Sequence, residues 1–145
     1  MKKNKSKLIK YLASEFSNEF IQIPVTLLPN NDIVYNHYLI KQEDNNWVLY
    51  NMNNKDLMAT FFLKSCALVA AKYHNSRQLN KYFEIKQLDS SYCRNYANSV
   101  IYKHNIKNTK DEDKKLMLLN RLECSELEVS HFKNQISRLF RCSFV

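Results

Sequence analysis

The sequence contains no glycine and only two prolines among its 145 residues. Glycine is the usual residue where a backbone needs a positive φ or approaches a phosphate closely. Its absence excludes glycine-rich phosphate-binding loops and a G-x-S-x-G nucleophile elbow. Tight turns must then depend on Asn and Asp, which tolerate the left-handed region better than other residues. The candidate turns are Asn30 to Asp32, Asp44 to Asn46 and Asn51 to Asp56.

A long apolar run is also missing. The most apolar stretch, FFLKSCALVAAKYH at residues 61–74, is interrupted by Lys64 and again by Lys72. A membrane-spanning helix needs about 20 predominantly apolar residues, so we expect no membrane association. At helical spacing this stretch is apolar most of the way round, which predicts a buried central helix over 61–74. One face of that helix comprises Phe62, Cys66, Val69 and Tyr73.

The four cysteines form no recognisable metal motif. They stand far apart, without a C-x-x-C pair and without a histidine at ligand spacing, so we predict no metal site. The N-terminus lacks the apolar segment and cleavage site of a signal peptide, which predicts reduced thiols in a cytoplasm-like compartment. Cys66 and Cys124 have apolar neighbours and are interpreted as small core residues.

The segment before the central helix has the pattern of a sheet. Residues 32–42 and 46–51 are rich in β-branched and aromatic residues and predict an antiparallel hairpin. Alternation places Ile33 and Tyr35 on one face of the first strand, and Tyr38 and Ile40 on the other. Residues 56–61 fit a third short strand or the first turn of the helix. We favour the strand, because a lone two-stranded hairpin is marginal in water.

The N-terminal segment 7–20 predicts an amphipathic helix, because apolar residues recur every four positions from Leu8 to Phe20. Two prolines then exclude a helix over residues 21–30, so an extended connector that packs its aliphatic side chains on the core is expected there.

From Arg77 onward the pattern is helical. A first helix is predicted over 77–104, with one apolar stripe formed by Ile85, Leu88, Tyr92, Tyr96 and Val100. The sequence TKDE at 109–112 matches a capping box with Thr109 as N-cap, which predicts a second helix over 110–140, continuous or broken near residues 125–130.

The second helix carries a heptad seam. Its members are spaced 4, 3, 4, 3, 4, 3 along the chain: Leu118, Leu122, Ser125, Val129, Phe132, Ile136 and Leu139. The seam fits a helical hairpin packed within one chain, and a homodimer through residues 118–139 is the alternative.

The net charge of +8 is unevenly distributed. Residues 61–110 hold nine Lys and Arg against two Asp and Glu. A basic face attracts nucleic acid or an acidic protein. The other explanation is a solvated helix face in a composition biased toward residues with AT-rich codons, and the sequence leaves both open. The candidate contacts are Lys64, Lys72, Arg77, Lys81, Lys86, Arg94, Lys103 and Lys107.

Aromatic residues gather in the predicted sheet. A β-ribbon can enter the major groove of DNA, but the segment 21–60 holds two lysines against four acids. We therefore interpret its aromatic side chains as core or as a protein interface: Tyr35, Tyr38, Trp47 and Tyr50.

No catalytic constellation is visible. His37, His74, His104 and His131 stand apart from acids and thiols, and the cluster at residues 111–113 is explained by acids that complement a helix dipole. We predict that the protein is not an enzyme and needs no cofactor.

Three runs resemble small proteins without an assigned activity from tailed phages of the marine cyanobacterial myovirus type. They are YLIKQEDNNWVLYNMNNKDLMATFFLKSCALVAAKYHN, EIKQLDSSYCRNY and IKNTKDEDKKLMLLNRLECSE. The resemblance carries no catalytic or ligand motif, so it transfers no site residues. It implies a viral gene product made in the cytoplasm of an infected bacterial host, with association with the virion as an option.

Together these observations predict one α+β domain over residues 1–145. A small antiparallel sheet of two or three strands would pack on the central helix, with an N-terminal helix and a C-terminal helical hairpin. The expected function is a non-enzymatic phage-type binding or assembly module that holds a protein partner, either a virion component or a host factor. The alternative is a nucleic-acid-binding accessory protein that uses the basic helical face.

Overall fold

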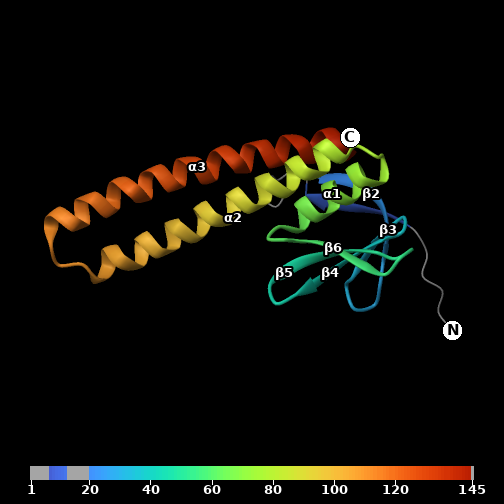
Figure 1. Cartoon of the computed structure of the whole chain (residues 1–145), viewed down its shortest axis with the longest axis horizontal. Coiled ribbons are helices and arrows are strands. Elements are labelled where there is room, and N and C mark those ends of the chain that lie inside the picture. Colours follow the sequence, from blue (N-terminus) through green and yellow to red (C-terminus); the bar gives the residue numbers. More distant parts are fainter. Residues whose placement is uncertain (1–6, 13–19, 145) are drawn as a thin grey trace.

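The protein is an α+β structure with an antiparallel sheet and three helices (Figure 1). The computed structural model describes residues 7–12 and 20–144, and side chains are considered over 23–144. The strands are β1 (Lys7–Leu12), β2 (Phe20–Leu27), β3 (Ile33–Tyr35), β4 (Tyr38–Glu43), β5 (Asn46–Asn51) and β6 (Asp56–Phe61). They lie in the order β1-β2-β3-β4-β5-β6, so each strand pairs with its neighbour in sequence. The helices are α1 (Lys64–Asn75), α2 (Leu79–Asn108) and α3 (Glu112–Phe144).

The N-terminal half of the sheet corrects the sequence-based prediction. Residues 7–12 form strand β1, where a helix was predicted over 7–20, and residues 13–19 lie outside the described part of the chain. The expected extended connector is strand β2, which pairs with β1 from Lys7↔Val25 to Leu12↔Phe20. Pairing with a neighbouring strand outweighs the four-residue spacing that favoured a helix. Ile23 and Val25 are buried, as expected for aliphatic side chains packed on the core.

Pro24 is tolerated in β2 because it lies outside the part of this strand that pairs with β3. Its cross-strand neighbour is Leu8 in β1, whereas β3 pairs only with Thr26 and Leu27. Because β3 does not extend as far as Pro24, the N–H group that proline lacks removes no hydrogen bond between β2 and β3.

The strand predicted over residues 32–42 is two strands, β3 and β4. A turn at Asn36 and His37, with Asn36 at φ 53°, separates β3 from β4. Tyr35 therefore pairs directly with Tyr38, and both side chains are buried on the same face of the sheet. The prediction of opposite faces was wrong because strict alternation ends where the chain reverses.

Asn and Asp replace glycine in two of the three predicted turns, whereas in the third, between Asn51 and Asp56, the left-handed residue is Lys55 at φ 59°. The β4–β5 hairpin turns at Asp44 and Asn45, which have φ values of 50° and 67°. Two consecutive positive φ values match a type I′ hairpin turn, which fits the twist of the flanking strands. Asn31 is also left-handed, at φ 71°, in the first predicted turn.

Helix α1 is the centre of the core, as predicted from its apolar composition. All residues from Ser65 to Ala71 are buried, together with Tyr73. The helix begins at Lys64 because Phe61 still belongs to β6, which confirms the third predicted strand. The carboxylate of Asp89 in α2 accepts hydrogen bonds from the backbone N–H groups of Phe62 (2.9 Å) and Leu63 (3.1 Å). This contact supplies a cap that the sequence around Leu63 lacks.

Helices α2 and α3 form the expected helical hairpin, and α3 is continuous. The predicted capping box was wrong. Thr109 ends α2, and its Oγ1 donates to the carbonyl of Asn105 (2.6 Å). Asp111 caps α3 instead, because its Oδ1 accepts from the backbone N–H groups of Asp113 (2.9 Å) and Lys114 (3.4 Å).

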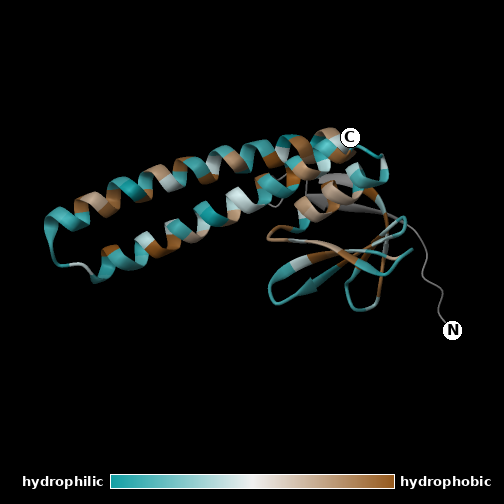
Figure 2. Cartoon of the chain, in the orientation of Figure 1, coloured by the Kyte–Doolittle hydropathy of each residue, from teal (hydrophilic) through white to brown (hydrophobic). Residues whose placement is uncertain are grey.

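The hairpin is longer than the part of the molecule that supports it (Figure 1). Core side chains, and those packed against the core, extend to Tyr92 in α2 and resume at Val129 in α3. We call residues 93–128 the arm, and the sheet, α1 and the remaining parts of α2 and α3 the body. The arm projects beyond the sheet and carries apolar segments along both helices (Figure 2).

Candidate protein-binding surface

The arm has very little interior of its own. Among residues 93–128, only Ser99 and Ser125 are buried. Both are small residues, and the hydroxyl of Ser99 donates to the backbone carbonyl of Tyr96 (2.7 Å). Two packed helices with serines at their most buried positions gain little from the hydrophobic effect, which scales with apolar area removed from water.

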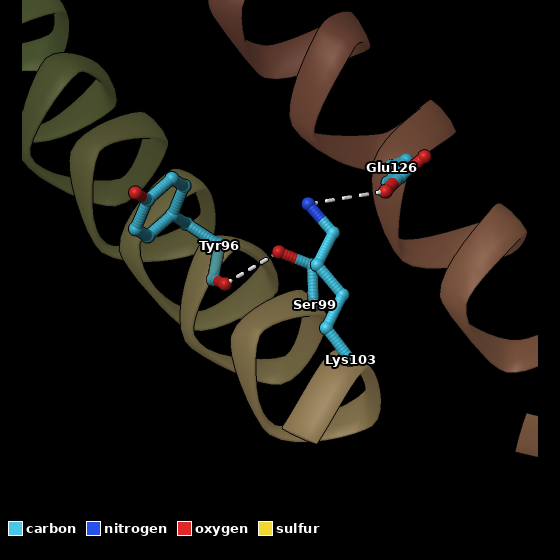
Figure 3. A network of polar contacts seen from close by, with 4 residues as sticks. All are labelled: Tyr96, Ser99, Lys103 and Glu126. Carbon is cyan, nitrogen blue, oxygen red and sulfur yellow. Dashed lines mark hydrogen bonds and ion pairs between the residues drawn. The ribbon is translucent and has the colours of Figure 1, made fainter. Parts of the chain in front are cut away.

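One ion pair joins the two helices of the arm. Lys103 Nζ of α2 lies 3.5 Å from Glu126 Oε1 of α3, while the Tyr96 ring lies on α2 away from α3 (Figure 3). Both charged side chains are more than half exposed, so the pair contributes at most a small stabilisation. The arm is therefore held mainly by the half-buried part of the heptad seam.

The seam itself faces α2, as the preferred prediction stated. Each of its seven residues is buried or half-buried, from Leu118 to Leu139. Alternating spacings of three and four average 3.5 residues, which keeps the stripe directed at one neighbouring helix. A dimer through this seam would have to displace α2.

Apolar side chains that would normally fill a core are exposed on the arm. Among the side chains described over 23–144, seven of the twelve exposed large hydrophobic ones belong to the 36 residues of the arm. They are Tyr96, Val100, Ile101, Leu116, Met117, Leu119 and Leu127. Such a concentration on a projecting element is typical of a surface that meets another protein.

Two of these residues, Tyr96 and Val100, lie beside the aromatic rings of Phe62 and Tyr92 where the arm joins the body. The rings of Phe62, Tyr92 and Tyr96 lie within 5.8–6.1 Å of one another, and Val100 follows Tyr96 by one helical turn. Tyr96 is 45% exposed and Val100 50% exposed. We call Phe62, Tyr92, Tyr96 and Val100 the junction surface.

A shallow hollow of about 310 Å³ adjoins the junction surface. It lies between the edge strand β6 and α2 and shares Phe62 with the junction surface. The hollow is also lined by Arg94 and by Cys93, and the pKa of the Cys93 thiol is raised by burial and by the charge of Asp89. A raised pKa keeps this thiol protonated at neutral pH, so it is a poor nucleophile.

The aromatic residues of the sheet that were interpreted as core or as a protein interface lie away from the junction surface. Tyr35 and Tyr38 are 6% and 1% exposed and belong to the core, so neither can line an exposed interface. Trp47 is half-buried beside Lys64, and the Tyr50 hydroxyl donates to Glu43 Oε2 (2.9 Å).

The predicted basic residues are dispersed. Lys64 belongs to α1 and Lys72 to its last turn, Arg77 lies in the connection to α2, and Lys107 is at the far end of α2. On α2, Lys81 and Lys86 point about 140° apart around the helix axis, and Arg94 lies about 80° further on. The residues therefore do not converge on one exposed face.

Several of these lysines also have local contacts. Lys103 is paired with Glu126, and three other ammonium groups approach an aromatic ring: Lys64 over Trp47 (5.4 Å), Lys81 over Tyr73 (5.8 Å) and Lys86 over Tyr82 (5.5 Å). Each contact gives the ammonium group a partner inside the chain, which leaves it less available to an external anion.

One of the four histidines, His74, has a specific structural role. The Tyr38 hydroxyl lies 2.6 Å from His74 Nδ1 and joins β4 to the end of α1. Burial and the nearby His37 lower the pKa of His74, and burial raises the pKa of Tyr38. A neutral His74 can therefore accept a hydrogen bond from the Tyr38 hydroxyl at Nδ1. Among the described residues, no three metal-ligating side chains come together.

The cysteine interpretation holds for one residue of the two. Cys66 is fully buried in α1, but Cys124 is exposed on the arm. Apolar neighbours in sequence suggested a core position, yet those neighbours alternate between the seam and the outer side of α3.

The predicted stripe places Tyr96 and Val100 with the buried residues of α2, and the residue spacing alone does not separate them. Tyr92, Tyr96 and Val100 are each four residues apart. Because a helix repeats every 3.6 residues, each step of four rotates the side chain by about 40°. Relative to Ile85, Tyr92 and Tyr96 therefore point about 20° to either side and Val100 about 60° away, so Tyr96 stays on the buried face and is exposed because the cover of α2 ends.

No protein-family model, no curated protein and no solved structure matches the chain. None of the helices within the described residues has the length and apolar character that crossing a membrane requires.

Proposed function

We propose that this protein is a non-enzymatic binding or assembly module of phage type that holds a protein partner, a virion component or a host factor, at the junction surface. One observation carries the proposal. The face of α2 that α1 covers in the body continues into the arm without a cover, where it exposes Tyr96 and Val100.

The chemistry of this surface suits a protein partner. Aromatic side chains are enriched in protein interfaces, where a clustered aromatic anchor often dominates the binding energy. The Phe62–Tyr92–Tyr96 cluster is held by ring contacts before any partner arrives, so binding loses little side-chain entropy. Arg94, which lines the hollow, adds a charged side chain that can orient a partner.

Nucleic acid is the less favoured partner, because the basic residues point in several directions and some are engaged within the chain. The two partners also differ in salt dependence. Binding through phosphate contacts weakens steeply with salt, whereas an aromatic interface retains most of its affinity.

Site-specific photocrosslinking in the cells that produce the protein tests the proposal. A benzophenone side chain at Val100 should crosslink to one protein species in a defined stoichiometry, and the same probe at Asn105 serves as a matched control on the arm. Adding Tyr96→Ser should abolish the crosslink, because it removes the aromatic anchor.

A companion titration with labelled double- and single-stranded DNA uses a salt series. We expect no binding stronger than the millimolar range at physiological salt. Crosslinking of Val100 to nucleic acid alone, or equal protein crosslinking at Val100 and Asn105, would contradict the proposed function.

A further inference from the structure

We infer that the partner covers the arm with one acidic amphipathic helix, which lies across α2 and α3 and continues the position that α1 has in the body. The inference rests on the proposed function and names the kind of segment that meets the junction surface. We call the side of the arm that this helix would cover the open face. Its residues from α2 and then from α3 are Tyr96, Val100, Lys103, Lys107, Lys115, Leu119, Leu122 and Glu126.

In the body, a helix of the chain itself already has this position. Helix α1 contacts both α2 and α3, and it shares one core with Tyr82 and Ile85 of α2 and with Ile136 of α3. It begins at Lys64, directly after the backbone N–H groups that Asp89 caps. Among the described elements, only α2 and α3 extend from there along the arm (Figure 1). The structure therefore shows which kind of element covers this side of the two helices.

Both long helices keep the same side toward this position along the arm. At 100° per residue, the four α2 residues of the open face share a sector of about 80° with Tyr82 and Tyr92, which are buried in the body. The four α3 residues share a sector of about 60° with the buried Phe140. The ion pair between Lys103 and Glu126 joins the two sets, so they lie on one side of the hairpin (Figure 3).

The open face has apolar side chains that a further helix would bury. Tyr96, Val100 and Leu119 are 45%, 50% and 45% exposed, and Leu122 is half-buried. An amphipathic helix binds such a surface with apolar anchors at helical spacing. An extended segment would gain no backbone hydrogen bonds there, because α2 and α3 use their backbone groups internally. The face is about 17 Å long from Tyr96 to Lys107, so about three turns of a helix cover it.

The charges of the open face select an acidic helix. Three of its residues are basic, and its single acid, Glu126, is paired with Lys103. In the part of the chain that the structure describes, Lys107 and Lys115 have no ion pair, and they lie where α2 ends and α3 begins. Acidic side chains of the partner helix are complementary to these two lysines, whereas a basic helix would be repelled.

Photocrosslinking at two levels of the open face measures the conformation of the partner segment. Benzophenone side chains are placed at Val100 or at Lys107, seven residues apart on α2, and mass spectrometry locates the partner residues that each one labels in the producing cells. A helix places the two labelled sites about seven residues apart, in a segment rich in Asp and Glu, because both helices rise by about 1.5 Å per residue. An extended segment places them about three residues apart.

A charge reversal tests the acidic character of the helix. Lys107→Glu combined with Lys115→Glu should lower the crosslinking yield of the Val100 probe about tenfold, because it replaces attraction by repulsion. Lys114→Glu combined with Arg121→Glu is the matched control. It makes the same change in net charge at exposed positions that lie about 100° or more around α3 from Lys115, and it should leave the yield unchanged. Circular dichroism confirms that each variant is folded.

The outcomes separate this inference from the proposed function. Labelled sites about three residues apart would overturn the inference and leave the proposed function intact. So would an unchanged yield after the charge reversal, or an equal loss in the matched control. Labelling of a second copy of this chain would also overturn it. The absence of any protein label at Val100 would instead contradict the proposed function, and the inference with it.

Discussion

The body and the arm use the same two helices but differ in what covers them. In the body, α1 and the sheet bury Tyr82, Ile85 and Tyr92 of α2. In the arm, α2 and α3 have only each other, and two serines are the buried residues. A long helical hairpin therefore extends beyond its core only by leaving apolar side chains in solvent, where they are available to other proteins.

The largest expected effect is the loss of stability when a leucine side chain is truncated, and this loss should differ between the body and the arm. Leu68→Ala in α1 should destabilise the protein by about 3–4 kcal/mol, because Leu68 is fully buried and the cavity cannot close. The matched change Leu122→Ala in the arm should cost about 1 kcal/mol, because Leu122 is only half-buried. Urea unfolding followed by circular dichroism measures both. Equal losses would remove the distinction between body and arm.

The second-largest expected effect is the loss of stability when an aspartate that caps a helix is replaced, and it should differ between Asp89 in the body and Asp111 in the arm. Asp89→Ala should cost about 2–3 kcal/mol, since it leaves the N–H groups of Phe62 and Leu63 unbonded in the body. Asp111→Ala, whose carboxylate caps α3 at the exposed end of the arm, should cost about 1 kcal/mol. Chemical unfolding of the two variants gives the comparison, and a larger loss for Asp111→Ala would contradict it.

A smaller effect depends on pH and belongs to the body alone. Burial lowers the pKa of His74 in the folded state, so the unfolded chain binds its proton more readily. This stabilisation is present above the unfolded pKa of about 6.5 and is lost as pH falls through the lowered folded pKa.

Thermal unfolding at pH 8 and pH 5 tests this sign. The wild type should exceed His74→Gln in stability at pH 8, and the difference should shrink at pH 5. His131→Gln, at an exposed position of α3, is the matched control for replacing a histidine by glutamine. A difference that grows on acidification would exclude a neutral His74 as the partner of Tyr38.

The smallest effect concerns the joint between α1 and α2. Arg77 has a φ of 59° just after the end of α1, a position where glycine is normally favoured. Arg77→Gly should therefore stabilise the protein by about 1 kcal/mol, while Arg77→Ala should not. Differential scanning calorimetry resolves this difference, and equal melting temperatures would show that the left-handed backbone is unstrained.

The sequence predicted the elements whose patterns depend on local chemistry. The apolar run of α1, the Asn and Asp turns and the heptad seam of α3 each reflect a requirement that is readable from neighbouring residues. Strand β1 was missed because its partner β2 lies beyond the intervening residues, and no local pattern reports a pairing partner. The division of residues 32–42 depended on one left-handed residue, Asn36.

The candidate site was harder to predict, because exposure depends on what lies opposite a residue. Tyr92 and Tyr96 are both tyrosines in one stripe, yet the first is 6% exposed and the second 45%. The sequence does not state where α1 and the sheet end relative to α2. For the same reason, the sequence left open whether Tyr35 and Tyr38 belong to the core or to a protein interface.

Hydrogen exchange of the full chain at low concentration tests the central claim most directly. If the body is self-sufficient and the arm depends on added contacts, amide protection should be high in α1 and in α2 up to Tyr92. It should fall in residues 93–128 and rise again in α3 from Val129, because local stability follows buried contacts. Uniform protection along both long helices would contradict the account, since it would show that the arm is as stable as the body without a partner.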